Sequence, residues 1–260
     1  MNKKLYFGSN LKMYKNTRET VAYLQRLESL TRDLSREETE LFILPSYTAL
    51  EQAAKQIDQS CIRLGAQNMC WEDRGQFTGE ISPCMLEEMG ISLVMAGHSE
   101  RRHLFRENNF EEEKKISCAL RHGFTALLCV GETDEEKEYG ISEEVIRTQL
   151  KTGLYGAAKT DRQKLMIAYE PVWAIGVHGR PAPVEYAQKI HSAIRKCLQE
   201  LFGKEGREIP VLYGGSVNSE NADALIAQPD VDGLYVGRAA WDADRFNRLI
   251  REAIRTRKNS

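Results

Sequence analysis

The sequence predicts an α/β protein, a single closed (β/α)₈ barrel that takes up residues 1–260 as one domain. Eight short aliphatic runs alternate with longer amphipathic stretches, and this repeated alternation is typical of a parallel sheet. The length of 260 residues is near the usual size of one such barrel. Eight units in that length favour a closed barrel over an open doubly wound sheet. No linker or shift in composition indicates a second domain.

The eight aliphatic runs predict strands that are buried on both faces. Their apolar residues are nearly continuous rather than alternating, as expected for parallel strands covered by helices. The runs are residues 5–10, 40–44, 62–66, 92–97, 125–130, 165–169, 209–215 and 232–237.

The stretches between the runs predict helices, because apolar residues recur in them at helical spacing. One helix starts at Thr17, and another follows Pro183, a residue that suits the first turn of a helix. Two more span residues 143–157 and 244–254.

The composition excludes several classes of protein. Hydrophobic residues make up 42% of the chain, charged residues make up 28%, and the net charge is −2 with no basic stripe. We therefore expect no nucleic-acid or membrane partner. The six cysteines form no C-x-x-C pair and no metal-ligand spacing with a histidine, so we expect reduced thiols and no metal. With no signal peptide and no apolar run of about 20 residues, the expected location is cytoplasmic.

Polar residues follow five of the predicted strands. In a barrel of this kind the chemistry lies at the C-terminal ends of the strands. The residues that follow strands one, four, six, seven and eight are Asn10 and Lys12; His98, Ser99 and Glu100; Glu170; Gly214, Gly215 and Ser216; and Gly237 and Arg238.

Four of these residues suit the transfer of a proton between adjacent carbons. Glu170 is the candidate base, His98 the candidate electrophile and proton shuttle, and Lys12 a fixed positive charge beside developing negative charge. Asn10 could donate a hydrogen bond to the same region. Each has a simpler explanation: Glu170 as a surface acid, His98 as a helix cap and Lys12 as a solvated cation. Their occurrence on one rim favours the catalytic interpretation.

Two turns indicate a phosphate site. The stretch YGGSV at 213–217 can converge backbone N–H groups on an anion. Gly237 opens the turn after the eighth strand. The loops after strands seven and eight are where barrels of this kind usually bind phosphate.

The apolar segment after Glu170, residues 171–176, has two interpretations. It could be a buried loop that packs on the barrel. It could also be a lid that closes on the substrate and excludes water. Exclusion of water matters because an enediolate beside a phosphate can expel that phosphate.

The chain resembles triosephosphate isomerase over nearly its whole length, which implies a TIM barrel. The matching stretches are GSNLKMY (8–14), AQN (66–68), QFTGEIS (76–82), AGHSERR (96–102), CVGE (129–132), AYEPVWAIG (168–176), YGGSV (213–217) and VDGLYVG (231–237).

The resemblance implies a role for each matching residue. Triosephosphate isomerase is a standard example of a glutamate base that acts with a neutral histidine and a closing loop. The implied roles are substrate binding by Asn10 and Lys12, electrophile for His98, base for Glu170, support from Glu100 and Ser99, and phosphate binding by Gly176, Ser216 and Gly237, with Arg238 beside them.

The resemblance also implies an isomerase of glycolysis and gluconeogenesis that needs no cofactor. It implies a homodimer, in which the loop that holds Phe77, Thr78 and Gly79 reaches into the partner's site near Lys12.

The chain departs from the family pattern at three places. Leu11 replaces a tryptophan, residues 177–181 read VHGRP where T-G-K-T-A is usual, and Arg238 replaces a glycine. The Arg238 side chain could enter the anion site or point away into the helix. Two substrates therefore stay open, a triose phosphate and a longer phosphosugar such as L-erythrulose 1-phosphate. A barrel that binds a phosphorylated ligand without turnover is a third, remote alternative.

Overall fold

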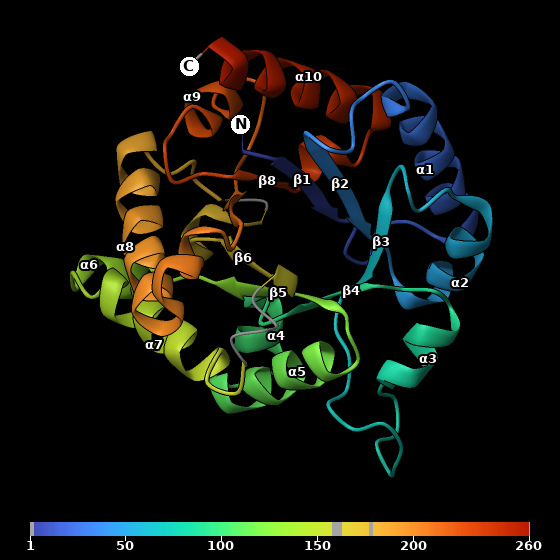
Figure 1. Ribbon diagram of the computed structural model, residues 1–260, viewed down its shortest axis with the longest axis horizontal. Coiled ribbons are helices and arrows are strands. Elements are labelled where there is room, and N and C mark those ends of the chain that lie inside the picture. Colours follow the sequence, from blue (N-terminus) through green and yellow to red (C-terminus); the bar gives the residue numbers. More distant parts are fainter. Residues whose placement is uncertain (1–2, 158–162, 177–178, 260) are drawn as a thin grey trace.

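The structure is a computed structural model that describes residues 3–157, 163–176 and 179–259. Eight parallel strands close into a barrel in chain order, with β8 pairing back onto β1, and helices surround it (Figure 1). The predicted α/β barrel is therefore confirmed. Among the described residues, no helix is long and apolar enough to cross a membrane.

The strands all run in the same direction around the barrel. They are β1 (Leu5–Asn10), β2 (Thr39–Leu44), β3 (Arg63–Ala66), β4 (Leu93–Ala96), β5 (Thr125–Val130), β6 (Leu165–Tyr169), β7 (Val211–Gly215) and β8 (Gly233–Val236).

Helices connect the strands and cover the outside of the barrel (Figure 1). The α-helices are α1 (Thr17–Thr31), α2 (Tyr47–Gln56), α3 (Pro83–Glu88), α4 (Ser99–Leu104), α5 (Asn109–Arg121), α6 (Asp134–Glu138), α7 (Ser142–Gly153), α8 (Val184–Phe202), α9 (Ala222–Ile226) and α10 (Ala243–Asn259). Short 3-10 helices are η2 (Val172–Ala174), η3 (Gly203–Arg207) and η4 (Arg238–Ala240).

The eight strands agree with the eight apolar runs, whereas two helices differ in length from the prediction. Helix α7 ends at Gly153, whereas the prediction extended it to 157. A Cβ on Gly153 would lie only 3.0 Å from the side chain of Leu128. Helix α10 continues to Asn259 instead of 254. Its last turn carries no apolar signal, but Arg257 donates to the carbonyls of Ile226 and Gln228 at 2.9 and 3.0 Å, and these contacts hold it.

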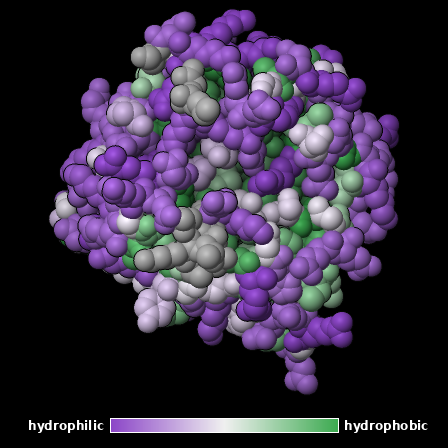
Figure 2. All heavy atoms as spheres, viewed as in Figure 1, coloured by the Kyte–Doolittle hydropathy of each residue, from purple (hydrophilic) through white to green (hydrophobic). Residues whose placement is uncertain are grey.

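Two apolar layers explain why the strands are buried on both faces. One layer lies between strands and helices, and a smaller one fills the barrel, with Phe42, Met95 and Tyr235 among its members. Phe42 fills so much of the interior that a Cβ on Gly8 would lie 2.0 Å from its ring. The molecular face in Figure 2 is mostly hydrophilic, and its hydrophobic side chains gather toward the centre. The core is therefore a packed solid, and the barrel is no pore.

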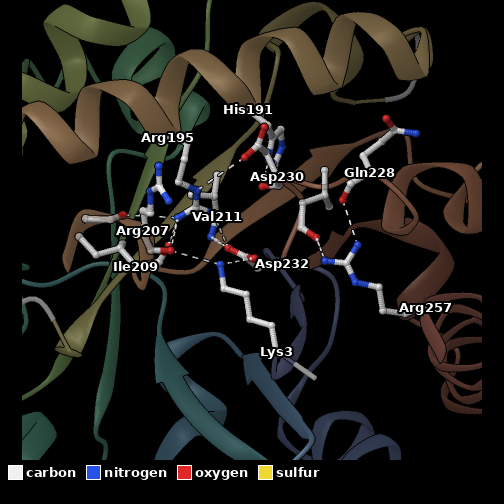
Figure 3. A network of polar contacts seen from close by, with 12 residues as sticks. Lys3, His191, Arg195, Arg207, Ile209, Val211, Gln228, Asp230, Asp232 and Arg257 are labelled. Atoms are coloured by element: carbon white, nitrogen blue, oxygen red, sulfur yellow. Dashed lines mark hydrogen bonds and ion pairs between the residues drawn. The ribbon is translucent and has the colours of Figure 1, made fainter. Parts of the chain in front are cut away.

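A buried ionic network holds the N-terminal ends of the last strands (Figure 3). The carboxylate of Asp232 pairs with Arg195 at 2.6 Å and with Lys3 at 2.7 Å, and it accepts the Val211 N–H at 2.9 Å. Arg195 also donates to the carbonyl of Ile209 at 2.6 Å. These bonds join α8, β7 and β8 at the end of the barrel that lies opposite the C-terminal strand ends.

One buried acid has no such partners. Glu112 on α5 is fully buried, and neither of its carboxylate oxygens has a hydrogen-bond partner among the described residues. Burial raises the pKa of the Glu112 carboxyl to about 7, and the charges of Arg102 and Lys115 only partly offset this effect. Glu107, a like charge, raises the pKa further. The folded protein therefore holds a proton at Glu112 that the unfolded chain releases at lower pH.

We expect this proton to make stability depend on pH. Between pH 4.5 and about 7 the folded state binds the extra proton, so the free energy of unfolding falls as the pH rises through this range. Glu112→Gln mimics the protonated acid and should be more stable than the wild type at pH 8, by on the order of 2 kcal/mol. The two proteins should be nearly equal at pH 4.5.

Urea unfolding at both pH values measures this difference. The exposed Glu88→Gln is the matched control and should show no pH-dependent gain. A gain for Glu112→Gln that is the same at both pH values would contradict the assignment.

Candidate active site

Glu170 directly follows β6, and strand register surrounds it with glycines. Tyr169 pairs with Val130 on one side and Tyr213 on the other, so the residues that follow these three lie at one level. A Cβ on Gly131 would lie 1.9 Å from the Glu170 carbonyl oxygen, and one on Gly214 would lie 2.5 Å from the Glu170 Cγ. Gly131 must therefore be glycine for the Glu170 backbone to fit, and Gly214 must be glycine for the Glu170 side chain to fit.

The Glu170 carboxylate is buried with one of its oxygens unpaired. The residue is 6% exposed, and its backbone N–H donates to the Val130 carbonyl at 2.8 Å. Oε2 has no hydrogen-bond partner among the described residues, and the Nε2 of His98 lies 3.8 Å from it. A buried oxygen without a partner is costly, and it leaves a strong acceptor free to take a proton.

His98 begins α4 and faces Glu170 at the same time. Its Nδ1 accepts the Glu100 backbone N–H at 3.2 Å, so the ring proton is assigned to Nε2. Nε2 therefore presents an N–H donor toward the site. The helix-capping and catalytic interpretations of His98 describe the same arrangement, since the cap fixes the tautomer.

Lys12 reaches the rim from an unusual backbone conformation. Its φ is 51°, and its N–H donates to the Asn10 Oδ1 at 2.7 Å, which turns the chain after β1. The Lys12 Nζ pairs with Glu100 Oε1 at 2.6 Å. Glu100 is half-exposed on the rim, and Ser99 lies beside Glu170 in the lining of a small hollow. The structure thus brings the residues from β1, β4 and β6 together.

Backbone amides with free N–H groups lie in the segments after β6, β7 and β8. The N–H groups of Gly176, Ser216, Gly237 and Arg238 donate to no acceptor within the described part of the chain. The Ser216 hydroxyl is engaged, because it donates to the carbonyls of Ala174 at 3.0 Å and Gly179 at 3.1 Å. Free amides with no partner suit an anion.

Glu132 is a residue of the site that the sequence analysis did not single out. It follows β5 on the same rim and is fully buried. Its Oε1 accepts from the Tyr186 hydroxyl at 2.8 Å, the Trp173 indole at 3.0 Å and the Tyr169 hydroxyl at 3.1 Å. Burial raises the pKa of the Glu132 carboxyl, and the three donors oppose that effect. Its place at a strand end was the available signal.

The residues that depart from the family pattern lie in different parts of the structure. Leu11 is buried in the apolar layer between strands and helices, so it does not face the site. Arg180 pairs with Asp134 at 2.6 Å, and the Arg238 guanidinium donates to the Gly176 carbonyl at 3.4 Å. The Arg238 side chain therefore extends toward the segment after Glu170. Residues 177 and 178 lie outside the described residues.

Two hollows differ in their relation to this site. The one beside Glu170 has a volume of about 10 Å³ and is lined by Ser99 and Cys129. A larger one of about 340 Å³ is lined by Tyr6 and Glu40, near the starts of their strands. The larger hollow thus lies at the other end of the barrel, away from Glu170, and it is not part of the candidate site.

One group of metal-ligand side chains lies outside the site. Within the described residues, Asp73, Cys84 and His122 bring one donor atom each to within 4.8 Å of one another. Asp73 already pairs with the His122 ring at 2.9 Å and with Arg121 at 3.3 Å. The Asp73 carboxylate therefore already has partners in Arg121 and His122, near α3 and α5.

The fold and the site together define a class of enzyme. A parallel barrel carries an unpaired carboxylate, an imidazole N–H and a lysine on one rim, beside free amides that suit a phosphate. This arrangement belongs to an isomerase that moves a proton between adjacent carbons of a phosphorylated sugar.

Comparison with known proteins agrees with this class. The family model described as triosephosphate isomerase matches residues 5–253, so the chain belongs to the triosephosphate isomerase family. L-erythrulose-1-phosphate isomerase of Rhizobium etli is 42% identical over 244 residues, which are 93% of this chain and 90% of the relative. Triosephosphate isomerase of Dictyoglomus thermophilum is 42% identical over 245 residues, 94% of this chain and 97% of the relative. Triosephosphate isomerase of Fusobacterium nucleatum is 40% identical over 250 residues, which are 96% of this chain and 98% of the relative.

The close approach at Gly214 yields a test of the geometry. Gly214→Ala places a methyl group 2.5 Å from the Glu170 Cγ, so the carboxylate must move. We expect kcat to fall by on the order of a hundredfold, since small displacements of a reacting group are costly. Calorimetric titration with inorganic phosphate should give a nearly unchanged Kd, because the free amides are not displaced. Unchanged kcat would mean that Glu170 need not occupy this position.

Proposed function

We propose that the protein interconverts glyceraldehyde 3-phosphate and dihydroxyacetone phosphate. The observation that carries the proposal is the buried, unpartnered Oε2 of Glu170, which faces the Nε2–H of His98 at 3.8 Å. The free Oε2 can therefore accept a proton from a substrate carbon that lies against it. At 3.8 Å the two groups make no hydrogen bond to each other, so each is free to contact a substrate that lies against both.

The chemistry follows from these positions. Glu170 takes a proton from the carbon next to the substrate carbonyl, and the electron pair moves onto the carbonyl oxygen. His98 donates its Nε2 proton to that oxygen, and Lys12 and Asn10 stabilise the developing negative charge. Glu170 then returns its proton to the former carbonyl carbon. At the same time His98 regains a proton at Nε2 from the hydroxyl of the neighbouring carbon, whose oxygen becomes the new carbonyl, and the isomerisation is complete. No cofactor enters this sequence.

The phosphate is bound at the other side of the site. The free amides of Gly176, Ser216, Gly237 and Arg238 would each donate to a phosphate oxygen. Since Gly176 lies in the segment after Glu170, phosphate binding would draw this lid over the substrate. A closed lid keeps water from the enediolate and suppresses loss of phosphate.

The choice between a triose and a tetrulose phosphate depends on where the two substrates differ. L-erythrulose 1-phosphate is dihydroxyacetone phosphate with a hydroxymethyl group on the carbon that loses its proton. The extra group must therefore lie near the Glu170 carboxylate, away from the phosphate. The small hollow beside Glu170 is lined by neither His98 nor Lys12, so its size does not select between the two substrates. The triose phosphate is the first candidate because two of the relatives compared above are named triosephosphate isomerase, and the tetrulose phosphate is the second.

The proposal extends to the setting of the enzyme. We place it in the cytoplasm, in glycolysis and gluconeogenesis, with residues 1–260 as one catalytic domain. The six free cysteines fit a reducing compartment.

The proposal also includes a homodimer. Met13 and Tyr14, next to Lys12, are 94% and 64% exposed, and Phe77 is 40% exposed. The segment between β3 and α3, which carries Phe77 and Thr78, projects from the body of the molecule (Figure 1). Exposed apolar side chains beside a projecting loop are typical of an interface. The second copy would place Thr78 near Lys12 and so complete the site.

Isotope exchange and a pair of substrates test the reaction. We expect turnover in heavy water to introduce deuterium at the carbon that loses its proton, and kcat/KM for the triose phosphates to exceed that for L-erythrulose 1-phosphate. Glu170→Asp pulls the carboxylate back by one methylene and should lower kcat on the order of a hundredfold or more. Glu185→Asp, an exposed acid on α8, is the matched control.

Each part of the proposal can fail separately. A preference for the tetrulose phosphate would replace the substrate and keep the mechanism. Full activity of Glu170→Asp would remove Glu170 as the base. Absence of deuterium incorporation would remove enediolate chemistry altogether.

Sedimentation velocity tests the dimer. We expect a mass of about twice 29.6 kDa for the wild type. Thr78→Arg should shift the protein toward the monomer and lower kcat/KM, because a charged side chain at the loop tip cannot enter the partner. Tyr155→Arg, at an exposed position beyond α7, should stay dimeric and active. A wild type that sediments as a monomer would contradict the proposal.

A further inference from the structure

Arg238 places a full positive charge where the resemblance leads one to expect a glycine. It follows Gly237 at the end of β8, and its side chain is exposed. Its guanidinium makes one hydrogen bond to a described residue, to the carbonyl of Gly176 at 3.4 Å. Gly176 is the lid residue whose own N–H is free, so the guanidinium lies next to the group of free amides.

The charges of the site leave Arg238 unneutralised. Lys12 pairs with Glu100 at 2.6 Å, and Arg180 pairs with Asp134 at 2.6 Å. Arg238 forms no ion pair within the described residues. The four free amides carry no net charge, and the Ser216 hydroxyl donates to the lid backbone. A phosphate dianion held by the amides alone would thus lack a cation at its own end of the site.

The geometry of a guanidinium suits two simultaneous contacts. It has five N–H donors in a rigid fork, and the contact with Gly176 uses one of them. The remaining donors are free for phosphate oxygens. A lysine or a glycine at this position could not join the lid tip and the phosphate in this way.

We propose that the Arg238 side chain binds the substrate phosphate and, through Gly176, fastens the lid over it. The inference rests on the proposed function in one respect, the binding of a phosphorylated sugar. The same phosphate that the amides hold would draw the guanidinium inward, and the contact with the Gly176 carbonyl would then hold the lid closed. Lid closure is coupled to the phosphate and is independent of the remainder of the substrate.

This role is independent of substrate length. Triose and tetrulose phosphates share the phosphate, its carbon and the carbonyl, and they differ only at the carbon near Glu170. Loss of Arg238 should therefore weaken both substrates by the same factor and leave the ratio of their kcat/KM values unchanged.

Calorimetric titration with inorganic phosphate tests the inference directly. Arg238→Ala should raise the Kd for phosphate roughly ten- to hundredfold, the usual cost of one charge-assisted pair of hydrogen bonds. Arg238→Lys keeps the charge without the fork and should recover part of this loss. Arg248→Ala, an exposed arginine on α10, changes the net charge equally and is the matched control.

The outcomes separate this inference from the proposed function. A Kd that is equal in Arg238→Ala, Arg248→Ala and the wild type overturns it, as does a wild type that does not bind phosphate. A loss in Arg238→Ala with an altered ratio of kcat/KM for the two substrates overturns the placement of Arg238 at the shared end. If the wild type prefers the tetrulose phosphate, the proposed substrate fails while the loss of phosphate affinity in Arg238→Ala still supports the inference.

Discussion

The burial of the Glu170 carboxylate without a partner is the constraint around which the site is arranged. An unsatisfied buried oxygen is unfavourable, and it persists only where the surrounding structure holds it firmly. The register of β5, β6 and β7 provides this hold, because it sets Gly131 and Gly214 against the Glu170 backbone and side chain. The ionic network of Asp232 and Arg195 secures the opposite ends of the last strands. Barrel closure thus holds the Glu170 carboxylate in its buried position.

The segment after Glu170, the proposed lid, is attached to the barrel although residues 177–181 depart from the family pattern. On the near side the Trp173 indole donates to the buried Glu132, and the Ser216 hydroxyl donates to the lid backbone. On the far side Arg180 pairs with Asp134, and at the tip Arg238 reaches Gly176. Both arginines stand at positions where the family usually has a small residue. Charged side chains thus make two of the contacts that attach this segment to the rest of the barrel.

Much of this arrangement could be predicted from the sequence, for a definite physical reason. Parallel strands covered on both faces leave continuous apolar runs, and the residues after each run must share one rim, so Lys12, His98 and Glu170 were found together. Contacts between elements that are distant in the chain leave no pattern in the local sequence, so they could not be predicted. The sequence around Glu132 does not predict its three hydrogen-bond donors. The sequence around Glu112 looks like that of any acid on an exposed helix face, so it does not predict that Glu112 is buried.

The position of each departure from the family pattern decides what it means for the choice of substrate. Under the proposed function, Arg238 lies at the phosphate end of the site, where a triose and a tetrulose phosphate are identical. A change at this position then acts on phosphate affinity. Selection by length must act where the two substrates differ, at the carbon next to the proposed base Glu170. Relatives with either substrate name can therefore be equally similar to this chain overall, because the difference between their reactions involves only a few atoms near the base.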